Sequence, residues 1–299
     1  MTSNSLAECE EIWERAPEVA FDDLPQFDKW SARMLGLEAW EREERTPEDA
    51  EREYDREKYT PEYEYLLRHP EINQYHGLQQ SGAYSQESVI CTRKKRFRRF
   101  NNEEALQIHC KFIAEYVAAE MPAPALVELG AGDGRTILSM ATDPRLQGTR
   151  LFALEKMNAG QKIIQEMAKR RGLSPIIGPC DLSEEVITSV SIPEGAVFFT
   201  SVVWFMLQTP ARQLVDSLLR FKPKMVFHFE PFGCFYDLNS LYGQLCASYL
   251  RINKYNCANG NELKQLHGKS IEIVHEEFAV IGNNPFLPFS LIAWKPKKQ

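Results

Sequence analysis

Residues 127 to 136 read Val-Glu-Leu-Gly-Ala-Gly-Asp-Gly-Arg-Thr, and this stretch decides the fold. An acidic residue closes an apolar run, and three glycines follow at alternate positions, Gly130, Gly132 and Gly134. Glycine permits a positive φ and lets the backbone approach a ligand with no Cβ in the way. A helix expected from Thr136 onward adds its N-terminal N–H groups. The pattern predicts a strand that ends in a tight turn against a bound ligand.

The chain from Asn102 onward alternates between helix and strand patterns. The first helix begins near Asn102, follows apolar residues at helical spacing and ends before Pro122. Further helices are expected over 136–140, 158–171, 210–220 and 238–249, and strands over 125–129, 150–155, 175–177, 195–203, 224–229, 271–281 and 289–294. Strands that alternate with helices predict a parallel, doubly wound sheet. The last two strands have no helix between them and flank a turn signal at 282–285, so we expect an antiparallel hairpin.

The spacing of the glycines resembles motif I of the class I S-adenosylmethionine (SAM) methyltransferases. A dinucleotide-binding fingerprint reads G-x-G-x-x-G, whereas this chain has G-x-G-x-G after a strand that contains Glu128. The terminal hairpin agrees with that family, because a dinucleotide dehydrogenase usually lacks it. The resemblance covers residues 102–299. It implies an α/β, Rossmann-like sheet of seven strands, SAM as the cofactor and S-adenosylhomocysteine (SAH) as the product.

Cofactor contacts are expected at the carboxyl ends of the strands, where open α/β sheets bind their ligands. Glu155 ends the second strand, and a carboxylate there can accept hydrogen bonds from both hydroxyls of a ribose. The resemblance implies that Asp181 caps the adenine amino group and that Leu182 lies against the ring. The full set of expected contacts is Glu128, Gly130, Ala131, Gly132, Gly134, Glu155, Lys156, Asp181, Leu182 and Ser201.

Each strand-end acid also has a structural alternative. A lone acid at such a position often caps the next helix. Asp181 could cap the segment 183–186, and Glu155 could pair with Lys156 or Lys162. Three acids at the expected strand ends, together with the glycine loop, are much harder to explain as caps. The sequence therefore favours SAM binding.

The fifth strand supplies the expected acceptor site, which reads His228-Phe229-Glu230-Pro231. In one hypothesis Glu230 binds a cationic amine or guanidinium and His228 accepts the released proton. Trp204 and Phe205 then form an apolar or cation–π wall. In the other hypothesis His228 is the base for a hydroxyl and Glu230 is structural. A third alternative makes His228 a hydrogen-bonded core residue. His228 and Glu230 alternate along the strand, so both face the same side.

Three functions are open from the sequence. We expect N-methylation of a small amino or guanidino compound in metabolite biosynthesis. The alternatives are O-methylation of a sugar or another hydroxylated metabolite, and a SAM-binding scaffold without catalysis. The runs 228–231, 251–256 and 284–288 resemble bacterial methyltransferases of small-molecule or sugar biosynthesis. The chain departs from that pattern over 202–208, which is apolar where a polar, acid-containing motif is expected, so the acceptor does not follow from the resemblance.

Composition narrows the class of protein. The chain has 299 residues, of which 43% are hydrophobic and 26% charged, as in an ordinary globular protein. No apolar run approaches the roughly 20 residues of a membrane span, and the first residues lack the basic and apolar regions of a secretory signal. The seven cysteines include no C-x-x-C pair. We therefore expect a cytoplasmic protein with reduced thiols, no metal site and no membrane partner.

Charge is distributed unevenly along the chain. Residues 1–64 hold 20 acids and 8 bases, a balance of −12, and the remainder holds 22 acids and 27 bases, a balance of +5. The one dense basic run, 93–100, could contact a nucleic acid backbone, pack against the acidic leader, or form a surface loop. The last two are favoured, because the pI is about 5.6 and residues 200–201 lack the Asn/Asp-Pro-Pro-aromatic motif of enzymes that methylate bases. We expect no nucleic acid partner.

Residues 1–101 are expected to form a helical extension docked on a SAM-binding domain over 102–299. Thr46-Pro47-Glu48 has the composition of a helix start. The extension acts as a lid, a brace or an arm of a homodimer. Its aromatic residues are either lid or packing residues, namely Tyr63, Tyr65, Tyr75 and Tyr84.

Overall fold

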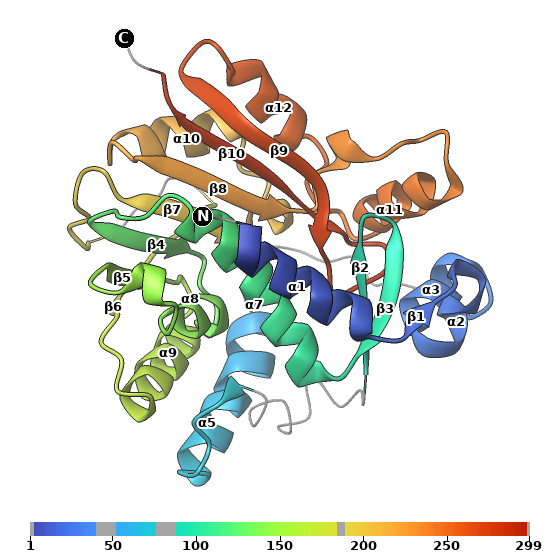
Figure 1. Cartoon of the computed structure of the whole chain (residues 1–299), viewed down its shortest axis with the longest axis horizontal. Helices are drawn as coiled ribbons and strands as arrows, with labels where there is room; N and C mark the ends of the chain where they lie inside the picture. Colours follow the sequence, from blue (N-terminus) through green and yellow to red (C-terminus); the bar gives the residue numbers. More distant parts are fainter. Residues whose placement is uncertain (1–2, 40–51, 76–87, 184–188, 298–299) are drawn as a thin grey trace.

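The computed structural model describes residues 3–39, 52–75, 88–183 and 189–297, and a seven-stranded sheet forms its centre (Figure 1). In spatial order the strands are β6 (Ile176–Gly178), β5 (Arg150–Leu154), β4 (Ala125–Leu129), β7 (Val197–Ser201), β8 (Met225–Glu230), β10 (Phe289–Pro296) and β9 (Ile271–Ile281). The strands from β6 to β8 are parallel, and β10 is antiparallel to both of its neighbours. The parallel sheet and the terminal hairpin expected from the sequence are confirmed.

Helices cover both faces of this sheet, because successive strand residues point to opposite sides. One face carries α7 (Asn102–Ala118), α8 (Arg135–Met140) and α9 (Asn158–Arg170), and the other carries α10 (Ala211–Leu219) and α12 (Asn259–Leu266). On β7, Phe199 points into the first core and Phe198 into the second. Every residue of β4 and β8 is buried, as expected for parallel strands that are covered on both sides.

The order of the strands reverses between β4 and β7. The chain steps outward from β4 to β5 and β6, then returns to place β7 and β8 on the other side of β4. Open sheets bind ligands in the crevice at such a reversal, outside the carboxyl ends of the strands. The register pairs Leu129 with Thr200, so the glycine loop and Ser201 leave the sheet side by side. The topology alone therefore places a ligand site at the glycine loop.

The strands and helices expected after residue 101 are all present, with bounds shifted by only a few residues. Helix α12 was not expected. The cap of α7 is Asn101: its Oδ1 accepts the N–H of Glu104, and Glu104 Oε2 accepts the N–H of Asn101. This reciprocal capping box satisfies two N–H groups that the helix leaves unpaired. It fixes the start of a helix that lines the site described below.

The N-terminal extension is not only helical. Its helices are α1 (Ser3–Arg15), α2 (Leu24–Phe27), α3 (Lys29–Met34), the π-helix η2 (Arg52–Tyr59) and α5 (Thr60–Arg68). A small antiparallel sheet accompanies them, in the order β1 (Glu18–Val19), β3 (Arg96–Phe100) and β2 (Val89–Arg93). The basic run 93–100 thus comprises the end of β2, the hairpin turn and the whole of β3, and the turn is at Lys94 and Lys95, both at positive φ. The density of arginine and lysine hides the period-2 pattern of these strands.

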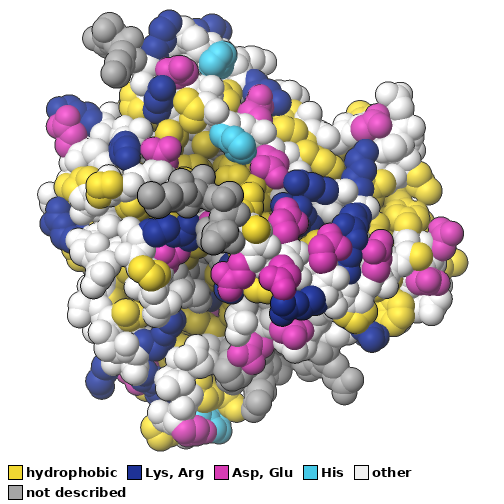
Figure 2. Space-filling model, viewed as in Figure 1, with side chains coloured by type: hydrophobic (Ala, Val, Ile, Leu, Met, Phe, Trp, Pro, Cys, Tyr) yellow, Lys and Arg dark blue, Asp and Glu magenta, His cyan; other side chains and the backbone are white. Residues whose placement is uncertain are grey.

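The basic run packs against the acidic leader, as one of the sequence alternatives predicted. Arg93 pairs with Glu10 at 2.6 Å, and Arg96 pairs with Glu14 at 2.5 Å. Arg98 is buried and also contacts Glu14. Figure 2 shows acidic and basic side chains interleaved over α1 and the β2–β3 hairpin. The opposite charges of the two regions therefore join them.

The second part of the extension is fixed to both ends of α9. Asp55 Oδ1 accepts the N–H of Ala159 at 3.1 Å, in the first turn of α9. In the last turn, Arg170 donates to the carbonyls of Leu66, His69 and Ile72 at 2.7 to 2.8 Å. The N–H of Ala159 is one of the unpaired groups at the start of a helix, and the three carbonyls lie in the last turn of α5 and in the segment that follows it. The segment from η2 to residue 72 is therefore a brace for α9.

Some expectations fall outside this description. The helix start at Thr46-Pro47-Glu48, Tyr84 and most of the segment 183–186 lie outside the described residues. Among the helices of the described ranges, none is both long enough and apolar enough to cross a membrane. The cytoplasmic location and the division of the chain at residue 101 stay predictions.

Candidate cofactor and acceptor site

The glycine loop has the backbone conformation that its sequence predicts. Gly130, Gly132 and Gly134 adopt φ values of +69°, +59° and +79°, which L side chains rarely tolerate. A Cβ on Gly130 would lie 2.5 Å from Val203 Cγ2, and one on Gly132 would lie 2.7 Å from the Tyr59 hydroxyl. The backbone N–H groups of Gly130 and Ala131 donate to the carbonyl of Leu154. The loop is held against β5 and leaves no room for side chains.

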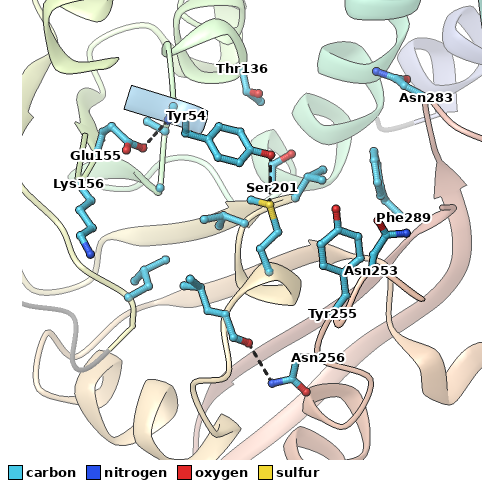
Figure 3. A pocket seen from close by; sticks show the side chains of 18 of the residues that line it. Tyr54, Thr136, Glu155, Lys156, Ser201, Asn253, Tyr255, Asn256, Asn283 and Phe289 are labelled. Atoms are coloured by element: carbon cyan, nitrogen blue, oxygen red, sulfur yellow. Dashed lines mark hydrogen bonds between the residues drawn. The ribbon is translucent and has the colours of Figure 1, made fainter. Parts of the chain in front are cut away.

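A cavity of about 1920 Å³ opens at this edge of the sheet (Figure 3). Cavities for one small molecule typically measure about 300–1,000 Å³, so this one has room for two ligands. Its glycine-loop side is lined by Glu128, Gly130, Ala131, Gly132, Glu155, Lys156, Asp181, Leu182 and Ser201. Its other side, here called the acceptor side, is lined by Asp28, Trp30, His109, Arg251, Asn253, Lys254, Tyr255, Asn256, Asn283, Asn284 and Phe289.

The structure brings together nearly all of the expected cofactor contacts. Every residue of that set except Gly134 lines the cavity. Gly134 instead begins α8, and a Cβ there would lie 2.7 Å from Ile164 Cγ1. Gly134 is therefore required by its positive φ and by the close packing of α8 on α9, and not by contact with the cavity.

The two glutamates on this side hold the loop. Glu128 Oε2 accepts the N–H of Ile137 at 3.1 Å in the first turn of α8, and burial raises the pKa of Glu128 well above its ordinary value. Glu155 accepts the N–H of Gly132 at 2.7 Å and that of Met157 at 2.8 Å. Burial raises the pKa of Glu155 to about 7. Each carboxylate oxygen has two lone pairs, so Glu155 can still accept hydrogen bonds from a ligand.

Asp181 forms the local contact of a cap and also lines the cavity. Its Oδ1 accepts the N–H of Ser183 at 2.8 Å, as a cap would, and its Oδ2 pairs with Lys156 at 3.0 Å. Desolvation acts to raise the pKa of Asp181, but the hydrogen bonds from Ser183 and Lys156 outweigh it and lower the pKa. The carboxylate lines the cavity and stays ionised at neutral pH, and Leu182 lines the cavity beside it.

Glu230 is not at the acceptor site, and this prediction is wrong. Its side chain is fully buried and does not line the cavity. Its carboxylate accepts the N–H groups of Val203, Trp204 and Phe205 at 3.1 to 3.3 Å. Burial raises its pKa to about 7. Glu230 therefore caps the turn after β7, where a short 3₁₀ helix (Trp204–Met206) begins.

His228 is a hydrogen-bonded core residue, so the two catalytic hypotheses for it are wrong. It is fully buried and away from the cavity lining. The indole N–H of Trp294 donates to His228 Nε2 at 3.0 Å, so Nδ1 carries the proton and donates to Thr200 Oγ1 at 3.0 Å. Burial lowers the pKa of His228 to about 3. The expected alternation with Glu230 is correct, but the shared side faces the core.

Trp204 and Phe205 also lie in the core rather than along the acceptor. Trp204 is fully buried and donates its indole N–H to the carbonyl of Thr209 at 3.0 Å. Phe205 packs edge-on against Tyr255, with ring centroids 4.5 Å apart. Neither side chain lines the cavity. The rest of the apolar run 202–208 lies along the cavity, which is lined by Val202, Val203, Met206, Leu207 and Gln208.

The N-terminal extension contributes lining residues that the sequence did not single out. Tyr54, Lys58 and Tyr59 come from η2, and the Tyr54 hydroxyl contacts Met206 Sδ at 3.3 Å (Figure 3). The ammonium of Lys58 lies 5.1 and 5.2 Å from the ring centroids of Tyr54 and Tyr59. Because the Tyr59 hydroxyl also lies against Gly132, η2 covers the glycine loop. Of the tyrosines proposed for a lid, none of the described ones lines the cavity.

The acceptor side is mostly uncharged. Figure 3 shows Asn253, Asn283 and Phe289 across the cavity from Glu155. The only carboxylate on the acceptor side, among the described residues, is that of Asp28, which accepts the N–H and the hydroxyl of Ser31 at 2.6 and 2.8 Å. Within the same ranges, no three His, Cys, Asp or Glu residues converge as a metal site.

The strand order 6-5-4-7-8-10-9, with β10 antiparallel at the end, decides the fold. It is the class I methyltransferase fold. Within this fold the cavity occupies the expected position at the glycine loop. The assignment rests on topology, since the glycine motif is local and other nucleotide-binding folds have similar loops.

No family model matches the sequence, and no curated protein matches it. Solved structures do match, at low identity. The geranyl diphosphate methyltransferase complex with GPP and sinefungin is 12% identical, covering 79% of this chain and 99% of its own, with a TM-score of 0.45. Mitomycin 7-O-methyltransferase MmcR is 13% identical, covering 84% of this chain and 72% of its own, with a TM-score of 0.42. These values describe a likeness in fold alone, and they say nothing about the substrate of this chain.

Proposed function

We propose that the protein is a SAM-dependent methyltransferase. The observation that carries this proposal is the glycine loop at the strand-order reversal, with three positive-φ glycines and the acids of β4, β5 and β6 opening into a cavity with room for two ligands. A cofactor that needs close backbone approach and acceptors for ribose and adenine fits this set of donors and acceptors. When bound, the cofactor would supply an electrophilic methyl group.

Each cofactor contact has a chemical role in this proposal. Glu155 accepts the ribose hydroxyls while it also anchors Gly132. Asp181 accepts the adenine amino group, and Leu182 packs against the ring. The backbone at Gly130 and Gly132 leaves space in which no side chain fits. These residues hold the cofactor, and the remaining chemistry is to position an acceptor, which can contribute many kcal/mol to catalysis.

The acceptor is a small molecule, and we infer that it presents a hydroxyl. The expectation of an amine or guanidinium depended on Glu230, which lies in the core. A cationic acceptor would meet no carboxylate other than Asp28 on the described acceptor side. The amides of Asn253 and Asn283 and the face of Phe289 suit an uncharged, hydroxylated acceptor, with hydrogen bonds from the amides. N-methylation of a cation, the absence of nucleic acid partners and a homodimer stay predictions.

The test is SAH release from purified protein with SAM, across a panel of sugars, phenols, amines, guanidines and amino acids. We expect release with hydroxylated acceptors. Release only with amines or guanidines would restore N-methylation. SAM binding by calorimetry without release from any acceptor would support a scaffold without catalysis, and lack of SAM binding would overturn the proposal.

A further inference from the structure

We propose that His109 binds the nucleophilic hydroxyl of the acceptor and takes its proton. This inference rests on the proposed function and names the residue that would act on the acceptor. His109 belongs to α7 and was not singled out by the sequence, where it is one of six histidines. Its side chain lines the cavity although the residue is 6% exposed. Along α7, Asn102, Leu106 and His109 line the cavity from one helical face.

Three elements meet at this histidine. Its Nε2 lies 3.3 Å from Ser201 Oγ, at the carboxyl end of β7. Its ring packs edge-on against Phe289, at the start of β10, with centroids 5.6 Å apart and an interplanar angle of 89°. Ser201 follows Thr200, which pairs with Leu129, so Ser201 lies beside Gly130 at the strand-order reversal. His109 is therefore placed where the glycine-loop side and the acceptor side meet.

The other ring nitrogen has no partner. His109 Nδ1 is buried and makes no hydrogen bond with any described residue. Buried polar atoms almost always have a partner, so an unsatisfied one on a side chain that lines a cavity points to a ligand. When the proton lies on Nε2 and is donated to Ser201, Nδ1 keeps a lone pair that can accept from a hydroxyl. The Ser201 hydroxyl can accept this proton, and the tautomer that results suits an acceptor with an O–H group.

The charge state agrees with this role. Burial, together with the neighbouring Arg135 guanidinium, lowers the pKa of His109 to about 4, so the imidazole is neutral near pH 7. As the acceptor oxygen bonds to the methyl carbon, the carbon–sulfur bond breaks with its electron pair on sulfur. The hydroxyl proton moves to Nδ1 and later to solvent. One positive charge is present before and after the transfer, so the cavity never holds a separated pair of new charges.

Two substitutions at this position separate the ring nitrogens. The amide of His109→Asn lies near the position of Nδ1, and that of His109→Gln near the position of Nε2, but neither can take up a proton. We expect turnover to fall about 100-fold or more in both variants, the usual range for loss of a general base. SAH affinity should stay within about twofold of wild type, which shows that the variants fold. His275→Asn, on an exposed strand residue, is the matched control.

Binding is measured separately from methyl transfer. The protein is labelled at its histidine ring nitrogens, and resorcinol, methyl glucoside or guanidine is added in the presence of SAH. The His109 signal, assigned by its loss in His109→Asn, should shift with the hydroxylated probes and not with guanidine, while His275 stays fixed. If the His109 signal does not shift with either hydroxylated probe, or if His109→Asn keeps wild-type turnover, the inference is overturned. A His109 shift in a protein that transfers no methyl group would support His109 as an acceptor ligand while the proposed enzyme activity fails.

Discussion

The two sides of the cavity are built in different ways. On the glycine-loop side, ten consecutive residues, 127–136, determine a backbone conformation that excludes side chains. On the acceptor side, α3, α7, the turn after α11 (Leu241–Ile252) and the β9–β10 turn each contribute a few separate side chains. A site made by backbone conformation accepts few substitutions and fixes one ligand. A site made by separate side chains can change its ligand through single substitutions, while the fold remains the same.

The largest effect is expected from Gly132→Val. The substitution places a side chain at φ +59° and 2.7 Å from the Tyr59 hydroxyl, so SAM binding should become undetectable by calorimetry, with at least a 100-fold loss of affinity. Gly148→Val is the control, since Gly148 has φ +81° but no atom within 4 Å of its Cβ position. Equal losses in both variants would mean that the backbone strain unfolds the protein and that the loop has no special role.

Glu230→Gln should change stability rather than acceptor chemistry. The folded pKa of Glu230, about 7, lies above its ordinary value of 4.5. The contribution of this group is therefore complete below pH 4.5 and is lost as the pH rises through 7. Glutamine does not titrate, so the stability of wild type relative to the variant should fall between pH 5 and pH 8, by on the order of 3 kcal/mol.

Urea unfolding at the two pH values measures this difference. Glu64→Gln, on the exposed side of α5, is the control and should show no such change. If Glu230→Gln leaves the pH dependence of unfolding as in wild type and removes turnover instead, Glu230 acts on the acceptor and our correction is wrong.

Glu155→Ala should weaken SAM binding by about 10- to 100-fold. The carboxylate anchors the N–H of Gly132 at 2.7 Å and is proposed to accept the ribose hydroxyls, and hydrogen bonds to charged groups contribute about 1.5–3 kcal/mol. Calorimetry with SAM measures the loss. Glu194→Ala, an exposed partner of Lys222, is the control. An unchanged affinity would make Glu155 a structural acid only.

Asn283→Ala should have the smallest effect. It tests whether the acceptor side and the glycine-loop side of the cavity bind their ligands independently. Removal of one uncharged hydrogen-bonding group costs about 1 kcal/mol, so we expect KM for the acceptor to rise about 3- to 10-fold with the SAM dissociation constant unchanged. Steady-state kinetics with the preferred hydroxylated acceptor measures both values. The control is Asn239→Ala, which is exposed and outside the cavity lining. A parallel loss of SAM affinity would show that the two sides are not independent.

The elements that the sequence predicted well are those with a local signal. Strand β4, the glycine loop and the β9–β10 hairpin follow from apolar runs, glycines and a turn within a few residues. The acids at 155 and 181 follow because strand ends of a parallel sheet converge. Glu230 satisfies the same rule and still fails, because only packing decides whether a strand-end acid turns toward the cavity or toward the N–H groups of the next turn.

Contacts between distant segments had no local signal. The Tyr59 hydroxyl lies against Gly132. Ser201 contacts His109, from which it is separated by 92 residues in the sequence. The β2–β3 hairpin was missed because six of the eight residues from 93 to 100 carry a positive charge, which resembles an exposed loop. The helical spacing of Asn102, Leu106 and His109 was visible in the sequence, but nothing there showed which face of α7 meets the cavity.

The brace on α9 also has a consequence for the order in which the chain is made. The carbonyl of Leu66 accepts a hydrogen bond from Arg170, which lies 104 residues later in the chain. At roughly 5–20 residues per second, a ribosome needs about 5–20 s to make that interval. Residues 52–72 leave the ribosome first, yet their partners on α9 arrive only after the glycine loop has emerged. The brace therefore completes the site late in synthesis, although it stands early in the sequence.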